Sequence, residues 1–113
     1  KSASLGIRNQ KLLQIINLFD AEIDQEINLD DVALTAGVSR RQMERLFAHH
    51  LQRTPRRYLM DLRLQRARAL MAETDLPVSE VAVACGFTSA EHFSKRFRER
   101  FGVSPYSFVV TST

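Results

Sequence analysis

Arginine residues are gathered in one part of this sequence. Residues 40–68 hold nine arginines and no lysine against two acids, whereas residues 20–31 hold six acids and no base. A guanidinium group is planar and carries five N–H donors, so it suits phosphates and base edges. The formal net charge of +3 is modest, but such clustering is expected of a nucleic-acid binder. An inert, solvated charged face is the alternative.

Two short helices separated by a tight turn are predicted between Val78 and Pro105. The first, 79–85, has an apolar face, and Gly86 ends it where a positive φ is often needed. Thr88 or Ser89 can cap the second helix. That helix carries a predicted buried stripe of three residues spaced four apart: Phe93, Phe97 and Phe101. This outline is typical of a helix-turn-helix that reads DNA, and a plain helical hairpin is the alternative.

The rest of the chain predicts further helices and no strand. Gly37 marks a turn, Ser39 caps the helix after it, and Thr54-Pro55 and Ser104-Pro105 each begin another helix. The predicted helices span 9–24, 30–36, 40–51, 55–73, 79–85, about 90–101, and the residues from 105 onwards. The expected fold is therefore all-α, with seven helices that form two helix-turn-helix subdomains joined by a long linking helix.

An internal repeat relates the two halves of the chain. Val32-Ala33 and Gly37 match Val81-Ala82 and Gly86 at an offset of 49, and downstream matches have an offset of 50. The linking helix, 55–73, has a length of roughly 28 Å at about 1.5 Å per residue. One turn of B-DNA measures about 34 Å, so two reading helices at that separation can enter successive major grooves.

Other chemistries lack the residues that they need. Cys85 is the single cysteine, so it forms no internal disulfide or cysteine metal cluster. His49, His50 and His92 lack the acidic or cysteine partners of a metal site. No nucleophile–base set or phosphate loop is recognisable, so we expect no enzyme activity, metal or cofactor. No apolar run reaches 18 residues and no signal peptide is visible. We expect no membrane partner and a cytoplasmic location.

The sequence resembles the DNA-binding domain of the AraC/XylS family of bacterial transcription regulators over roughly residues 10–109. The shared C-terminal signature consists of Arg63-Leu64, Ala67, Leu70-Met71, Val78, Val81-Ala82, Gly86-Phe87, Phe93, Lys95, Phe97, Gly102 and Ser104-Pro105. The resemblance implies seven helices, two helix-turn-helix subdomains, and a monomeric domain that bridges or bends two adjacent major grooves of double-stranded DNA. It also implies a separate sensor or dimerisation domain, and we expect RNA polymerase as a further partner.

This resemblance and the repeat predict how the chain is divided. We expect a linker from a missing N-terminal domain and then an AraC-type DNA-binding domain in two subdomains. The predicted segments are 1–8 for the linker, 9–113 for the domain, and within it 9–54, the linking helix 55–73, and 74–113.

Base contacts are expected from the outer face of each reading helix. Arg41 and Arg45 can each bind the O6 and N7 atoms of a guanine, and Glu44 can accept from cytosine N4. An intrahelical pair with Arg40 or Arg41 is the alternative for Glu44. In the second reading helix, the resemblance implies groove-facing positions at Ala90, Glu91, His92, Ser94 and Lys95.

Further basic residues are expected to position the protein without specifying a sequence. The predicted phosphate contacts are Arg40, Arg53, Arg56, Arg57 and Arg98. Arg63 is expected to tie the linking helix to the second subdomain by a salt bridge. The predicted function is sequence-specific binding of double-stranded DNA by a transcription regulator. A helical protein-interaction module is the alternative, and its binding would be insensitive to salt, whereas DNA binding weakens steeply with salt.

Overall fold

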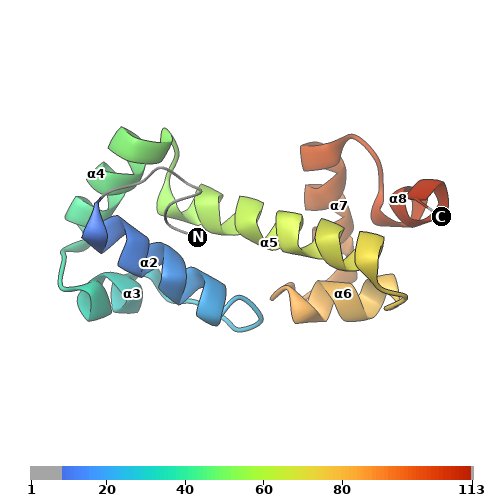
Figure 1. Cartoon of the computed structure of the whole chain (residues 1–113), viewed down its shortest axis with the longest axis horizontal. Coiled ribbons are helices and arrows are strands. Elements are labelled where there is room, and N and C mark those ends of the chain that lie inside the picture. The colour runs from blue at the N-terminus through green and yellow to red at the C-terminus, as the bar shows by residue number, and fades with distance from the viewer. Residues whose placement is uncertain (1–8, 113) are drawn as a thin grey trace. The chain divides into compact units, whose positions relative to one another are not determined.

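The computed structural model describes residues 9–112, and these residues fold into helices without a strand among them (Figure 1). The prediction of an all-α fold with seven helices is confirmed for this range. The predicted linker at 1–8 lies outside it. The helices are α2 (Gln10–Ala21), α3 (Leu29–Ala36), α4 (Arg40–Leu51), α5 (Pro55–Glu73), α6 (Val78–Ala84), α7 (Ala90–Phe101) and α8 (Pro105–Ser112).

Local capping chemistry sets most of these boundaries. α4 and α5 have the predicted limits, 40–51 and 55–73. The first helix is shorter than predicted, because Glu22 is its C-cap and leaves the helical region at φ −117° and ψ 24°. Ile23 is nevertheless buried, so its apolar character reflects burial in a loop rather than a continued helix.

The chain forms two compact units. In the described range, the first unit contains the residues up to Glu22 and then Glu26–Leu59. The second unit contains Ile23–Gln25 and the residues from Met60 onwards. The division therefore falls inside α5, which contributes its first turn to one unit and the rest to the other.

The first unit is built around α2, α3 and α4. Phe19 and Phe47 are fully buried, and their ring centroids lie 5.9 Å apart. Tyr58 packs against Phe47 with its ring centroid 5.5 Å away. Lys11 Nζ donates a 2.8 Å hydrogen bond to the carbonyl oxygen of Ala36, and it thereby satisfies an open carbonyl at the end of α3. This packing fixes which face of α4 is left exposed.

The second unit contains the predicted phenylalanine stripe. Phe93 and Phe97 of α7 are fully buried, and they pack with Ala67 of α5 and Val81 of α6 in one core. Phe101 is only half-buried. The guanidinium carbons of Arg68 and Arg100 lie 5.1 Å and 5.0 Å from the centroid of its ring, so cation–π contacts cover part of it.

The two helix-turn-helix turns have the same geometry, which supports the repeat. Gly37 and Gly86 have φ angles of 76° and 85°, a region that glycine enters without steric cost. The N–H of Val38 donates to the carbonyl oxygen of Ala33 at 3.0 Å, and the N–H of Phe87 donates to that of Ala82 at 2.9 Å. These bonds are the long closing bonds of a Schellman motif, so both turns end their first helix in the same way.

Candidate nucleic-acid interface

A capping box positions the first candidate reading helix, α4. Ser39 Oγ accepts from the N–H of Gln42 at 3.0 Å, and Gln42 Oε1 accepts from the N–H of Ser39 at 2.8 Å. These reciprocal bonds satisfy two N–H groups that the helix itself leaves open. Met43 and Phe47 point into the core with no exposed surface. The start and the rotation of α4 are thus both fixed.

The predicted base-contacting residues of α4 lie on the opposite side. Arg41, Glu44 and Arg45 are all exposed. Arg41 and Arg45 are four residues apart, a spacing that brings side chains onto the same face of a helix. The structure therefore brings these three residues together on a solvent-facing surface, and their contact with bases stays a prediction.

Arg40 differs from its neighbours because it joins two helices. Its Nη1 atom donates to Asp30 Oδ1 of α3 at 3.0 Å. Its Nε atom lies 3.2 Å from Glu44 Oε2. Of the two intrahelical partners predicted for Glu44, Arg40 and Arg41, the structure shows Arg40. A guanidinium shared by two carboxylates stabilises α3 against α4, and a phosphate would have to compete with both.

The second candidate reading helix, α7, is capped by Ser89. Ser89 Oγ accepts from the N–H of His92 at 2.9 Å, so Ser89 rather than Thr88 is the N-cap. The predicted base-contacting residues of α7 have unequal exposure. Ala90, Glu91, His92 and Lys95 are exposed, and Ser94 is half-buried. Lys95 stands 50 positions after Arg45, so the two units present a cation at equivalent places.

Three side chains on α7 form a hydrogen-bonded network that the sequence did not predict. Arg96 Nη1 donates to Glu99 Oε1 at 2.7 Å, and Arg96 Nε donates to His92 Nε2 at 3.4 Å. The His92 ring also packs edge-on against Phe87, with centroids 5.9 Å apart. Arg96 therefore orients His92, which is one of the predicted base contacts. The i, i+3 and i, i+4 spacings of these residues were the only available signal.

The remaining predicted phosphate contacts are exposed. These residues are Arg53, Arg56, Arg57 and Arg98. Arg53 Nε donates to the carbonyl oxygen of Leu51 at 3.3 Å, which directs its side chain along the end of α4. Exposure is necessary for binding to a phosphate. These four contacts remain predictions.

Arg63 has a different partner from the one predicted. We expected a salt bridge, but Arg63 Nη2 donates to the backbone carbonyl oxygen of Gln25 at 2.7 Å. Both residues belong to the second unit. The Nε atom is buried without a hydrogen-bond partner among residues 9–112, and burial lowers the pKa of Arg63. Arg63 thus ties α5 to the Ile23–Gln25 loop, a contact that the sequence pattern did not predict.

Two further observations concern other kinds of site. Within residues 9–112, no group of three His, Cys, Asp or Glu side chains is arranged to hold a metal ion. No helix in this range is long and apolar enough to cross a membrane.

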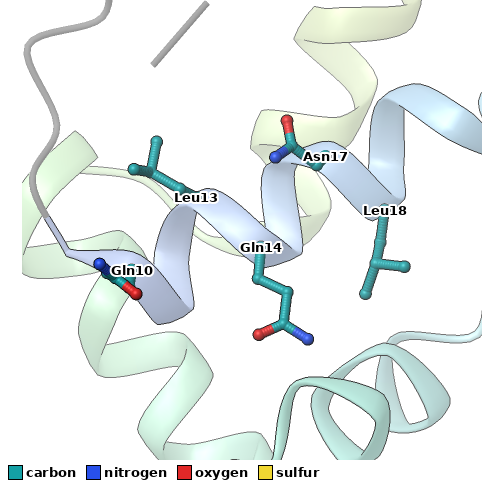
Figure 2. Close-up of a pocket in the computed structure, with 5 residues that line it drawn as sticks. All are labelled: Gln10, Leu13, Gln14, Asn17 and Leu18. Carbon is teal, nitrogen blue, oxygen red and sulfur yellow. The ribbon is translucent and has the colours of Figure 1, made fainter. Parts of the chain in front are cut away.

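A surface pocket lies along α2, and no described residue of α4 or α7 lines it. Its described lining residues are Gln10, Leu13, Gln14, Asn17 and Leu18 (Figure 2). All of them come from one helix, and none is charged. They offer a phosphate no cationic partner, so we do not include this pocket in the candidate interface.

Two equivalent helix-turn-helix units, each with a basic outer helix, define a class of DNA-binding protein. Comparison with known proteins supports this class. The family described as "Helix-turn-helix domain" matches residues 32–109. The HTH-type transcriptional regulator GbdR of Pseudomonas aeruginosa is 48% identical over 101 residues, which cover 89% of this chain and 28% of GbdR.

Solved structures show the same likeness. A transcriptional regulator from Chromobacterium violaceum, described as containing an AraC-type DNA-binding domain, has 39% identity and a TM-score of 0.86. That match covers 91% of this chain and 92% of the other. The DNA-binding domain of AdpA, crystallised with a target DNA, has 26% identity and a TM-score of 0.85, with coverages of 91% and 93%.

The chain belongs to the helix-turn-helix domain family, and its relatives place it among the AraC-type DNA-binding domains. The resemblance to the AraC/XylS family is therefore confirmed. The chain spans less than a third of the length of the first curated relatives that it matches, at 28% of GbdR and 31% of the regulator ArgR.

Proposed function

We propose that this chain binds double-stranded DNA in a sequence-specific manner, as the DNA-binding part of a bacterial transcription regulator. One observation carries the proposal: two units with the same turn geometry each present at least one exposed cation from the second helix of the motif. Those cations are Arg41 and Arg45 on α4, and Lys95 on α7. The AdpA domain, which has the same fold, was solved on DNA.

We assign base recognition to the outer faces of α4 and α7. Arg41 and Arg45 would bind guanine edges, because a guanidinium offers two parallel donors to O6 and N7. Glu44 would accept from cytosine N4 if DNA binding draws it from Arg40, which lies 3.2 Å away in the free chain. On α7, Lys95 would make the main polar contact, with Glu91, His92 and Ser94 beside it and Ala90 against a thymine methyl group.

We assign affinity to the phosphate contacts of Arg53, Arg56, Arg57 and Arg98. Each neutralised phosphate releases counterions. The logarithm of the binding constant should therefore fall linearly with the logarithm of the salt concentration. Arg40 would contribute mainly by holding α3 against α4 through Asp30. The proposed activity is binding rather than catalysis, because its chemistry consists of hydrogen bonds and ion pairs.

We further propose that the two units occupy adjacent major grooves of one duplex. The support is that α5 is one uninterrupted helix of 19 residues. Inserting one alanine between Leu59 and Met60, where α5 passes from one unit to the other, would rotate the following residues by about 100°. Footprinting on a selected duplex should then show lost protection in one half of the site. Equal protection of both halves would show that the units bind independently.

The full-length regulator would also require partners that this chain does not contain. We propose a sensor or dimerisation domain elsewhere in the protein, RNA polymerase as the target of regulation, and the bacterial cytoplasm as the location. The support is that the matched relatives are transcriptional regulators more than three times as long as the matched region.

Binding-site selection from random duplexes, followed by affinity measurements at several salt concentrations, tests the main proposal. A DNA-binding domain should enrich one sequence and show a slope of about −0.9 per phosphate contacted. No enrichment, together with salt-insensitive binding to a protein partner, would favour the alternative interaction module.

A further inference from the structure

The chain turns in the same way after each reading helix. Gln52 follows α4 with a φ of 54°, and Gly102 follows α7 with a φ of 83°, so both helices end in a left-handed residue. Thr54 Oγ1 then accepts from the N–H of Arg57 at 3.1 Å, and Ser104 Oγ accepts from the N–H of Ser107 at 3.1 Å. We call each such segment, 52–58 and 102–108, a corner.

Equivalent side chains anchor the two corners. Pro55 and Pro105 are both fully buried. Tyr58 packs against Phe47 with ring centroids 5.5 Å apart and planes at 64°. Phe108 packs against Phe97 at 5.8 Å and 66°. Since hydrogen bonds, buried prolines and ring pairs all coincide, residues 50 positions apart occupy the same place in each corner.

The exposed positions of the corners have diverged. Arg56 directly follows the first buried proline, and Tyr106 directly follows the second, with 62% of its surface exposed. Arg53 and Arg57 of the first corner correspond to Val103 and Ser107. The first corner is therefore strongly cationic, whereas the second has no charged side chain from 102 to 108.

We propose that Tyr106 is the second unit's counterpart of Arg56 and that its hydroxyl donates a hydrogen bond to a DNA phosphate. This inference rests on the proposed function, because it extends the predicted phosphate contact of Arg56 to the equivalent corner. A tyrosine hydroxyl is a regular phosphate donor. It is also neutral, so the second corner positions DNA without adding to the release of counterions.

The location of Tyr106 supports the duplex as its partner. The corner follows directly on α7, whose exposed Lys95 and Arg98 are predicted to meet DNA. The Tyr106 side chain offers one donor and an apolar ring, which fits a phosphate oxygen beside a deoxyribose. A protein partner for the exposed side chains of Val103, Tyr106 and Val110 is the competing outcome.

The test compares substitutions at the two equivalent positions in the whole chain. The probes are a duplex recovered by binding-site selection and a scrambled duplex of equal length, each measured at several salt concentrations. Tyr106→Phe should lower the affinity for both duplexes by about three- to tenfold, because it loses only one hydrogen bond. The slope of log affinity against log salt should not change. Arg56→Ala should lower the affinity and also reduce that slope by about 0.9.

A gain of charge provides the sharpest measurement. Tyr106→Arg should steepen the salt slope by about 0.9, since it recreates the first corner's cation beside the backbone. Val110→Ala, on the same helix and 73% exposed in the native residue, is the matched control and should change neither quantity. Circular dichroism melting should verify that every variant is folded.

The results separate the two proposals. If the native chain binds neither duplex in a salt-dependent manner, the proposed function fails and this inference fails with it. If the native chain binds and Arg56→Ala reduces the slope, but neither Tyr106 variant changes binding, only this inference is overturned. An unchanged slope for Arg56→Ala would remove the equivalence on which the inference depends.

Discussion

Arg63 Nη2 donates a 2.7 Å hydrogen bond to the carbonyl oxygen of Gln25, a residue 38 positions earlier in the chain. The bond holds a three-residue loop against α5 within the second unit. Gly86 lies at the same place, since a Cβ built on it would lie 2.9 Å from Arg63 Nε and 2.4 Å from the carbonyl oxygen of Ile23. The loop, α5 and the α6–α7 turn thus meet around one guanidinium.

Replacing Arg63 by methionine should reduce the free energy of unfolding by about 1–3 kcal/mol, because the Gln25 carbonyl loses a charged donor. Urea denaturation monitored by circular dichroism measures the change. Gln65→Ala, at an exposed position on the same helix, should cost little. Equal stabilities for the two variants would show that the Arg63 bond contributes nothing measurable.

Gly86→Ala should destabilise the chain by about 3 kcal/mol or more, because the new methyl group meets a backbone oxygen as well as an unfavourable φ of +85°. Gly102→Ala is the matched control. Its φ is +83° and nothing lies within 4 Å of the added carbon, so only the conformational cost of about 1–2 kcal/mol applies. Similar losses in thermal or urea unfolding would contradict the steric argument.

Arg45→Ala should weaken binding to the selected duplex by about 1–3 kcal/mol and relax the preference at one or two base pairs. The physical reason is the loss of a bidentate donor on the exposed face of α4. Repeating binding-site selection with the variant measures the preference. A uniform loss across all sequences would reassign Arg45 to a phosphate.

Phe97→Ala should cost about 3–5 kcal/mol of stability, because the ring is fully buried between Phe93, Phe101 and Phe108. A domain at the low end of the usual range, about 5 kcal/mol, would be largely unfolded by that loss. Leu34→Ala removes an apolar side chain that is 78% exposed, and its melting temperature should hardly change. Unchanged melting of the Phe97 variant would refute the assigned packing.

Burial raises the pKa of the Cys85 thiol from 9.0 to about 11, although Arg66 and Arg63 act in the opposite direction. The unfolded chain therefore releases the thiol proton first as pH rises. The stabilising effect of the neutral thiol is complete below pH 9 and declines between pH 9 and 11. The stability difference between the native chain and Cys85→Ala, from urea unfolding at pH 8, 9 and 10, should narrow with pH. A stability difference that stays constant from pH 8 to pH 10 would contradict the raised pKa of Cys85.

Local chemistry explains why the sequence predicted most helix boundaries. Ser39 caps α4 through atoms within three residues, and Thr54 and Ser104 each cap the start of a helix over the same distance. Positive φ angles at Gly37 and Gly86 likewise follow from glycine's lack of a Cβ. Helical spacing then placed Arg41, Arg45 and Lys95 on exposed faces, because the apolar residues opposite them must be buried.

Tertiary structure decided the interactions between residues distant in sequence. The pairing of Arg40 with Asp30 and the bond from Arg63 to Gln25 join separate elements. Asp61 is the one buried charged residue in the described range, and its Oδ1 atom lies 3.9 Å from Arg100 Nε within the second unit. A sequence shows that a cation is present, but several carboxylates and carbonyls can satisfy it. Only the packing of helices determines which of them lies within hydrogen-bond distance.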